Sequence, residues 1–446
     1  MFKKILIANR GEIALRIIRA CQEMDIRTVA VHSTVDQNSL FVKLADESVC
    51  IGPAKSSESY LVPQRILSAA EITGADAIHP GYGFLAENEE FAKVCESCGI
   101  SFIGPRPQDL ELMGDKIRSR QAMQKLGLTL LTSTAIQPED VQKNQKTIEK
   151  IGLPVIIKAS AGGGGKGIKI VRDMNDFWST VKTAQAEAQA AFGDATVYVE
   201  KYLENARHIE FQIAADQHGN IIHLGERDCS VQRRYQKIIE ESPSPAVDEK
   251  LRNNMGERVV KALKEVGYQN VGTVEFLMDD KKNFYFLEMN TRIQVEHPVT
   301  EEITDLDLIQ LQIRLAAGEE LPYRQKDIRF TGHAMEFRIN AEDPEKLLPS
   351  CGKITELHIP GGRGVRVDSG IYSGMDITPY YDSMLAKLII FGPTREQVIR
   401  KARASLQEFQ IEGISTNIPL HQRILGDESF LKGDVSTRYL DNLLKR

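Results

Sequence analysis

The sequence lacks the features that mark several large classes of protein. It has no apolar run near the roughly 18 residues of a membrane span, and the apolar stretch after its first lysines is too short for a secretory signal. Its six cysteines are scattered, and the one close pair, Cys95 and Cys98, has no second pair to complete a zinc site. The net charge is −6, so there is no global positive field for nucleic acid. These absences predict a cytoplasmic protein with reduced thiols and with neither a nucleic-acid nor a membrane partner.

A common nucleotide-binding motif is also missing. The N-terminal region alternates strand and helix patterns, which favours a parallel α/β sheet over residues 1–112. Its first turn offers only Gly11, without the further glycines of the dinucleotide fingerprint, and this disfavours an NAD enzyme. The first strand, helix and strand of this region are expected at 3–8, 11–23 and 27–32.

A run of glycines between two β-like stretches is the first distinctive feature that is present. The run follows Lys158 and precedes Lys166, but it is not a Walker loop, because the strand pattern 168–171 follows it where that motif opens a helix. Backbone N–H groups of glycines can approach an anion closely, and lysines add positive charge. We therefore predict a glycine hairpin that closes over phosphates, with a flexible linker as the alternative. The glycines are Gly162, Gly163, Gly164 and Gly165.

The segment from Glu288 to Pro298 alternates strictly between polar and apolar residues. In an extended strand successive side chains point to opposite faces, so this alternation predicts a strand with one polar face. That face combines carboxylates, amides and a guanidinium, which favours an anion and metal site over a solvated edge strand. Its residues are Glu288, Asn290, Arg292, Gln294 and Glu296.

A hairpin is predicted just before that polar face. The segment 271–290 contains two β-rich runs separated by a polar cluster. An even-length loop centred between residues 281 and 282 places Glu275 opposite Glu288, roughly 5 Å apart, where like charges repel. A divalent cation removes the conflict, and two acids with Asn290 suit Mg²⁺ or Mn²⁺ better than zinc. An odd-length loop is the alternative, and it would put the two acids on opposite faces.

The chain carries ten motifs in order: ILIANRGEIALRIIRA, HPGYGFLAEN, GDK, KASAGGGGKG, EKYLENARHIE, QRRYQK, GTVEF, EMNTRIQVEHP, GHAMEFRINAEDP and YYDSMLAKL. Together they resemble the ATP-grasp enzymes, and specifically the biotin carboxylase family. The resemblance implies an ATP-grasp fold of class α/β, α+β overall. We expect an N-terminal Rossmann-like parallel-sheet domain, a helical linker, a small glycine-hairpin lid and a large C-terminal α+β domain, with bounds 1–112, 113–129, 130–202 and 203–446.

The resemblance further implies a site for ATP with Mg²⁺ or Mn²⁺. The residues implied to hold the phosphates and the ribose are Lys116, Lys158, Lys166 and His208, with the four glycines closing over the phosphates. The residues implied to surround the adenine and the rest of the nucleotide are Glu200, Lys201, Leu203, Ile168, Leu277, Gln232 and Tyr235. Tyr235 stands where the family usually has histidine. The implied metal ligands are Glu275, Glu288 and Asn290.

A bicarbonate pocket and a biotin site are also implied. The implied pocket residues are Lys237, Arg292, Gln294 and the backbone of Val295. Glu296 would deprotonate bicarbonate, whose oxygen then attacks the γ-phosphate and gives carboxyphosphate. Arg338 would stabilise the enolate-like oxygen of biotin, and Tyr82 would lie beside the biotin ring. The alternatives are that Arg338 pairs with a structural acid, that Lys237 lies on a solvated face, and that Tyr82 only packs in a glycine turn.

No Met-Lys-Met biotinylation site occurs in the sequence, so we expect biotin to arrive on a separate biotin carboxyl carrier protein. The resemblance then implies carboxyltransferase subunits as partners, a homodimer, and the first half-reaction of acetyl-CoA carboxylase, which makes malonyl-CoA for fatty acid synthesis. The alternatives are a subunit of a pyruvate or propionyl-CoA carboxylase, another ATP-grasp ligase, and a catalytically inactive ATP-binding subunit.

Overall fold

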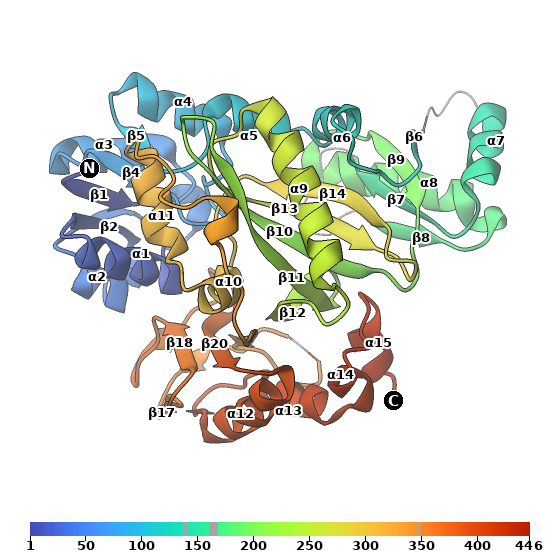
Figure 1. Cartoon of the computed structure of the whole chain (residues 1–446). Helices are drawn as coiled ribbons and strands as arrows, with labels where there is room; N and C mark the ends of the chain where they lie inside the picture. Colours follow the sequence, from blue (N-terminus) through green and yellow to red (C-terminus); the bar gives the residue numbers. More distant parts are fainter. Residues whose placement is uncertain (137–140, 160–167, 347) are drawn as a thin grey trace.

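The computed structural model describes residues 1–136, 141–159, 168–346 and 348–446. Its strands form three larger sheets, and the large antiparallel sheet lies between an N-terminal parallel sheet and a small antiparallel sheet (Figure 1). The C-terminal helices pack beneath the far end of the large sheet (Figure 1). In the part of the chain that is described, no helix combines the length and apolar character that crossing a bilayer requires.

The N-terminal sheet has five parallel strands in the order β3-β2-β1-β4-β5, which confirms the predicted parallel α/β region. Both faces are covered, since Ile5 and Ile7 join one apolar cluster and Leu6 joins another. The strands are β1 (Lys4–Ile7), β2 (Arg27–Ser33), β3 (Glu47–Gly52), β4 (Ala77–His79) and β5 (Ser101–Phe102). The helices are α1 (Gly11–Glu23), α2 (Leu40–Leu44), α3 (Pro63–Thr73), α4 (Glu89–Ser97) and α5 (Pro107–Gly114).

The small sheet follows helix α6 (Lys116–Lys125) and has the antiparallel order β6-β9-β7-β8. The two flanks of the glycine run pair as predicted, with Ile157 opposite Lys169. The glycines Gly162 to Gly165 and Lys166 lie outside the described residues. The elements are β6 (Ser133–Ala135), α7 (Val141–Ile151), β7 (Val155–Ala159), β8 (Lys169–Val171), α8 (Phe177–Phe192) and β9 (Val197–Lys201).

The large sheet is antiparallel throughout, in the order β14-β13-β10-β11-β12-β15-β20-β18. Its strands are β10 (Arg207–Ala215), β11 (Ile221–Arg233), β12 (Gln236–Ser242), β13 (Asn270–Met278), β14 (Phe284–Asn290), β15 (His333–Asn340), β18 (Val365–Ser369) and β20 (Met384–Gly392). Two short pairs join β16 (Gly352–Lys353) to β19 (Asp376–Ile377) and β17 (Leu357–His358) to β21 (Gln410–Ile411).

Helices cover this sheet and connect it to its neighbours. Helix α9 (Glu249–Val266) lies across β11. Helix α11 (Leu308–Ala316) shares an apolar cluster with α1 and β1, so one core joins the N-terminal and large sheets. The remaining helices are α10 (His297–Thr304), α12 (Arg395–Glu408), α13 (Ile418–Gly426), α14 (Glu428–Leu431) and α15 (Tyr439–Leu443).

The strand predicted from Glu288 to Pro298 is wrong beyond its first three residues. Strand β14 ends at Asn290, residues 291–296 form a loop, and α10 begins at His297. Pro298 in the first turn of α10 fits a helix start, and His297 Nδ1 lies 2.8 Å from the Gln294 carbonyl, which closes a tight turn. Alternation of polar and apolar residues therefore arose in a loop, where tertiary contacts set the direction of each side chain.

The hairpin prediction is confirmed, although the turn differs from the expected one. Glu275 lies opposite Glu288, but Met278 pairs with Phe284, so the connecting turn has an odd number of residues. The register shifts between Glu275 and Phe276, because Leu287 is an extra residue in β14. This bulge restores the pairing that an odd turn alone would have lost.

Candidate active site

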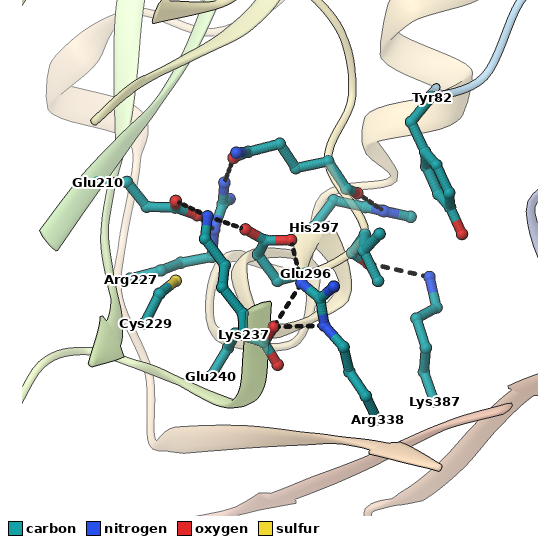
Figure 2. Close-up of polar contacts among 12 residues, drawn as sticks. Tyr82, Glu210, Arg227, Cys229, Lys237, Glu240, Glu296, His297, Arg338 and Lys387 are labelled. Atoms are coloured by element: carbon teal, nitrogen blue, oxygen red, sulfur yellow. Dashed lines mark hydrogen bonds and ion pairs between the residues drawn. The ribbon is translucent and has the colours of Figure 1, made fainter. Parts of the chain in front are cut away.

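Charged side chains from neighbouring strands converge on one face of the large sheet (Figure 2). Glu210 on β10 lies opposite Glu275 in one ladder and opposite Arg227 in the other, so the three share a face. Arg227 has no exposed surface, and its Nε donates to Glu210 Oε1 at 2.6 Å. The sheet thus holds buried acids and cations in fixed registration.

Lys237 on β12 lies at the centre of this face. Its ammonium donates to Glu296 Oε1 (2.6 Å), Glu210 Oε2 (2.6 Å) and Glu275 Oε1 (3.0 Å). Burial lowers the pKa of Lys237, but the three carboxylates outweigh burial and the pKa lies well above its ordinary value. Lys237 is therefore a charged group with only 13% of its side chain exposed, and the alternative of a solvated face is wrong.

Glu296 is held by a cation on each oxygen. Oε1 accepts from Lys237, and Oε2 accepts from Arg338 Nη2 at 2.9 Å (Figure 2). Burial raises the pKa of Glu296, but Lys237 and Arg338 outweigh burial, so the pKa lies well below its ordinary value. The carboxylate is ionised at neutral pH and can accept a proton, while Lys237 is placed to stabilise an anion formed beside it.

Arg338 on β15 lies between two carboxylates. Besides its bond to Glu296, its Nε donates to Glu240 Oε1 at 2.6 Å. The pairing with a structural acid that the sequence left open is therefore present, together with the contact to Glu296. Burial raises the pKa of Glu240 to about 7, although Arg338 opposes the shift.

Glu275 is the most heavily bonded acid of the site. Its Oε1 accepts from Asn290 Nδ2 (2.9 Å) and Gln294 Nε2 (2.8 Å), and its Oε2 lies 3.1 Å from His208 Nε2. Burial raises the pKa of Glu275, but Lys237 and His208 outweigh burial and the pKa lies well below its ordinary value. Burial also lowers the pKa of His208, yet Glu275 reverses the sign and the pKa is raised.

Glu288 shows the charge conflict that a cation would remove. Burial, and then the facing Glu275, raise the pKa of Glu288, while Lys116 Nζ lies 3.9 Å from Oε2. With Asn290, these two acids offer the hard oxygen donors that suit Mg²⁺. The residues present therefore fit the predicted metal.

The predicted anion-binding residues lie around Glu296 on the loop 291–296. Gln294 Oε1 accepts from Arg227 Nη2 at 2.7 Å. Arg292 reaches the N-terminal region, where its Nε donates to Glu87 Oε2 at 3.0 Å, and its Nη2 donates to Asn290 Oδ1 at 3.0 Å. Arg292 is thus held by a partner that the sequence did not indicate, and its role at bicarbonate stays a prediction.

Lys158 and Glu200 form a buried pair in the small sheet. Lys158 Nζ donates to Glu200 Oε2 at 2.5 Å, and Arg120 of α6 donates to the other oxygen. Glu200 lies opposite Ser133 of β6 and Ile156 of β7, so strands flank its backbone on both sides. The Lys201 amide donates to the Thr132 carbonyl at 3.0 Å. The contacts of both residues with an adenine stay predictions.

The other residues expected at the nucleotide are spread over the small and large sheets. Ile168 precedes β8 and Leu203 follows β9, while Gln232 lies in β11 and Leu277 in β13. Tyr235 lies in the two-residue turn between β11 and β12, with φ of 66° and 46 % of its surface exposed. No bound nucleotide tests these assignments, so they stay predictions.

Tyr82 lies in the turn between Gly81 and Gly83, both with positive φ. Its hydroxyl donates to the Glu12 carboxylate of α1. Burial, and then Glu12, raise the pKa of Tyr82 well above its ordinary value, so the hydroxyl keeps its proton. Glu12 in turn lies 3.2 Å from the ammonium of Lys387 on β20.

Cys229 lies beside this site but is not an activated thiol. It is fully buried, and burial, with Glu210 next in effect, raises its pKa well above the ordinary value. A thiol with a raised pKa is a poor nucleophile. This agrees with the prediction that the thiols are structural.

Several residues of the site were missed from the sequence. They are Glu12, Glu87, Glu210, Arg227, Glu240 and Lys387. For Glu210 a signal existed, because it shares strand parity with His208 within one motif. The others lie in strands or in the N-terminal region, and no spacing in the sequence connects them to the site.

Comparisons with known proteins agree with this geometry along the whole chain. The family models described as "Biotin carboxylase, N-terminal domain", "Carbamoyl-phosphate synthase L chain, ATP binding domain" and "Biotin carboxylase C-terminal domain" match residues 1–110, 115–324 and 336–442. The Haemophilus influenzae protein named biotin carboxylase is 54% identical over 445 residues, covering 100% of this chain and 99% of that one. A pyruvate carboxylase subunit of Methanothermobacter thermautotrophicus is 52% identical over 442 residues, covering 99% and 90%.

A solved structure is similarly close. It is the dimeric biotin carboxylase domain of Hydrogenobacter thermophilus 2-oxoglutarate carboxylase, in complex with MgADP, ADP and bicarbonate. It superimposes with a TM-score of 0.95 at 49% sequence identity and covers 100% of this chain and 99% of that one.

The fold and the site define an ATP-grasp enzyme. Within that class the chain belongs to the biotin carboxylase family, whose members are ATP-dependent ligases that use Mg²⁺, bicarbonate and biotin. The enzyme carboxylates biotin at the expense of ATP.

Proposed function

We propose that the chain carboxylates biotin held on a biotin carboxyl carrier protein, as the first half-reaction of acetyl-CoA carboxylase in fatty acid synthesis. The relative named simply biotin carboxylase, at 54% identity over the full chain, supports this assignment. The relatives named as pyruvate and 2-oxoglutarate carboxylase subunits favour a second candidate, in which the same half-reaction serves the carboxylation of a keto acid.

The observation that carries the proposal is an ionised Glu296 between two fixed cations. In the proposed mechanism bicarbonate binds to Lys237, Arg292, Gln294 and the Val295 N–H. Glu296 takes its proton, and the bicarbonate oxygen bonds to the γ-phosphorus as the bond to ADP breaks. The product of this step is carboxyphosphate.

The second step yields carboxybiotin. Carboxyphosphate separates into CO₂ and phosphate, the phosphate takes the ureido proton of biotin, and the nitrogen forms a bond to CO₂. Arg338 stabilises the negative oxygen that develops on the ureido group, and Tyr82 lies beside the biotin ring. The ureido N–H bond is thereby replaced by an N–C bond, its proton leaves on phosphate, and Glu296 returns its own proton to solvent before the next turnover.

Glu275, Glu288 and Asn290 would hold Mg²⁺, which would neutralise charge on the phosphates. Lys116, Lys158 and His208 would bind the phosphates and ribose, together with Lys166 and the Gly162 to Gly165 backbone, which lie outside the described residues. Glu200 and the backbones of Lys201 and Leu203 would read the adenine, which would pack among Ile168, Leu277, Gln232 and Tyr235.

We also propose the assembly in which this happens. The dimeric relative supports a homodimer, and carboxyltransferase subunits complete the overall reaction. The six cysteines are all free, which supports a reducing compartment such as the cytoplasm. The bounds 1–112, 113–129, 130–202 and 203–446 describe the proposed domains.

Release of ADP from the purified chain with Mg²⁺ and ATP tests the base. The rate should require bicarbonate, and Glu296→Gln should lower it by roughly 10²–10⁴-fold. Glu302→Gln is the matched control, because Glu302 lies in α10, which follows Glu296, and its carboxylate accepts from Arg366 Nη1 at 3.3 Å rather than from Lys237 or Arg338. A Glu296→Gln rate equal to that of the control would contradict the proposed role.

A coupled assay distinguishes the two candidate systems. The chain is combined with a purified biotin carrier protein and either an acetyl-CoA or a pyruvate carboxyltransferase. Malonyl-CoA formation supports the acetyl-CoA system, and oxaloacetate formation alone assigns the chain to the second candidate.

A further inference from the structure

Lys387 is a buried lysine next to the active site that the proposed mechanism does not use. It lies in the middle of β20 with no exposed surface. Its ammonium is 3.2 Å from Glu12 Oε2 and 4.0 Å from Asp368 Oδ2. Taking an ammonium out of water costs several kcal/mol unless it is paired and hydrogen-bonded. The carboxylates of Glu12 and Asp368 supply the negative charge that balances the ammonium.

The hydrogen bond of Lys387 points at the catalytic loop. Its Nζ donates to the Val295 carbonyl at 3.0 Å (Figure 2). That carbonyl belongs to the peptide that joins Val295 to Glu296, and the peptide is planar. Fixing the carbonyl therefore orients the Glu296 N–H and limits where the Glu296 Cα can lie, and it restricts rotation about ψ of Val295.

The loop needs such an anchor because it is not part of the sheet. Strand β14 ends at Asn290, so residues 291–296 have no ladder hydrogen bonds to set their orientation. Tertiary bonds must do so instead. Gln294 is held by Arg227 and Arg292 by Glu87, and Lys387 holds the peptide between them and α10.

The counter-charge of Lys387 comes from a different part of the chain. Glu12 belongs to α1, and its other oxygen accepts the Tyr82 hydroxyl. A continuous series of contacts thus runs from Tyr82 through Glu12 and Lys387 to Val295. In Figure 2 the Tyr82 hydroxyl and the Lys387 ammonium point toward one another on the same side of Arg338.

We propose that Lys387 is a positioning residue for bicarbonate activation, which holds the Val295–Glu296 peptide so that the general base and the Val295 N–H both face the bicarbonate. Glu12 balances its charge and connects it to Tyr82. The inference rests on the proposed function, because it needs Glu296 to be the base. Lys387 is bonded to Val295 and paired with Glu12 and is not among the residues proposed to bind a substrate, so its loss alters the geometry of the site without removing a reacting group.

The double variant Lys387→Met/Glu12→Gln tests this without leaving a buried charge unpaired. We measure ADP release without biotin, as a function of bicarbonate and of ATP. The KM for bicarbonate should rise by about tenfold or more, since a hydrogen bond from a charged donor is worth about 1.5–3 kcal/mol. The KM for ATP should not change. A folded double variant with the wild-type KM for bicarbonate would overturn the proposal.

Lys401→Met is the matched control. Lys401 also donates to two backbone carbonyls, of Arg363 and Phe391, at 2.7 Å each, but it lies on α12 away from the site. Its loss should lower the thermal midpoint while leaving both KM values at wild type. An equal rise in the bicarbonate KM of this control would show a general effect of stability and would also overturn the proposal.

If the double variant does not fold, Tyr82→Phe carries the test from the other end of the series. It removes one hydroxyl, and in the absence of biotin any contact of Tyr82 with the biotin ring plays no part. The KM for bicarbonate should rise by about twofold to fivefold, and an unchanged value would overturn the proposal. Wild-type ADP release that ignores bicarbonate would instead contradict the proposed function, so the two failures are distinguishable.

Discussion

Three buried carboxylates near Arg338 differ in protonation because their partners differ. Glu296 has two cations and a pKa well below its ordinary value, while burial raises the pKa of Glu240 to about 7. Glu336 has neither oxygen bonded among the described residues, and burial raises its pKa well above the ordinary value. Environment, rather than residue type, thus selects Glu296 as the ionised base at neutral pH.

We expect Glu240 to act through Arg338. In Glu240→Gln the guanidinium loses a charged partner at 2.6 Å and can shift toward Glu296. Biotin-dependent turnover should fall by about tenfold or more, whereas bicarbonate-dependent ADP release without biotin should fall much less. Measuring both rates in one preparation separates the two steps.

Glu336→Gln is the control for that experiment. Glu336 lies opposite Glu240 in the ladder of β12 and β15 and is equally buried, but no hydrogen bond joins it to Arg338. Its two rates should stay close to wild type. If Glu240→Gln lowered both rates equally, its effect would not run through Arg338.

At the residue scale the sequence predicted the groups that stand in motifs. Glu275 could be named from the hairpin pattern, whereas Lys237 and the base role of Glu296 came from the family resemblance. Lys387 could not be named, since it is one charge in an apolar strand. Glu240, next to Glu241 in β12, becomes meaningful only when strands distant in sequence pair. Local patterns carry no information on that pairing.

Among the elements, the β13–β14 hairpin makes the metal prediction testable. Glu288→Gln removes one of two facing acids and should raise the Mg²⁺ concentration for half-maximal ADP release by about tenfold or more. Asp280→Asn, at the exposed turn of the same hairpin, should leave it unchanged. An unchanged Mg²⁺ requirement in Glu288→Gln would argue for a different ligand set, such as His208, Glu210 and Glu275, whose ligand atoms lie within 4.8 Å of one another.

Strand β12 is tied to β15 and α12 through Glu241. Its carboxylate bonds His333 Nε2 at 2.8 Å and Arg395 Nε at 2.7 Å. Burial raises the pKa of Glu241, but His333 and Arg395 outweigh burial and lower it from 4.5 to about 2. Because the folded pKa lies below the unfolded one, this stabilisation is present above about pH 4.5 and is lost as the pH falls toward 2.

Glu241→Gln should therefore lower the free energy of unfolding at pH 7 by about 3 kcal/mol or somewhat less. The difference from wild type should narrow as the pH falls below about 4.5. Urea unfolding at a series of pH values measures this difference in the free energy of unfolding. The control is Glu408→Gln, because Glu408 pairs with His358 at the surface. If the difference in unfolding free energy between wild type and Glu241→Gln did not change with pH, the ionised carboxylate of Glu241 would not be the source of the stabilisation.

At the element scale the sequence predicted correctly which segments are helices or strands, but it was less accurate about where a strand ends. Helix α1 and the parallel strands followed from their sequence patterns, since the helix buries one clear face and the strands lie in a covered sheet. The strand beyond Asn290 was wrong, because loop residues held by Arg227, Glu87 and Lys387 can alternate like a strand. The hairpin register was right, although an odd turn and a bulge at Leu287 produced it.

Across the whole molecule the site draws on all three sheets. Tyr82 and Glu87 come from the N-terminal region, Lys158 and Glu200 from the small sheet, and the reacting acid from the loop beside the large sheet. The motifs in order predicted this assembly through the family resemblance. Physical patterns alone predicted the parallel sheet, the hairpin and a metal site. They could not predict how the sheets pack against one another, because that packing depends on buried contacts such as those between α1 and α11.

Transfer of labelled carbon from bicarbonate to biotin tests the central claim most directly. With Mg²⁺ and ATP, the wild-type chain should place label on biotin or on its carrier protein in step with ADP release. Arg338→Ala should lose most label transfer while keeping bicarbonate-dependent ADP release, and Glu296→Gln should lose both. Sustained ADP release by the wild type with no label on biotin or carrier would contradict the account.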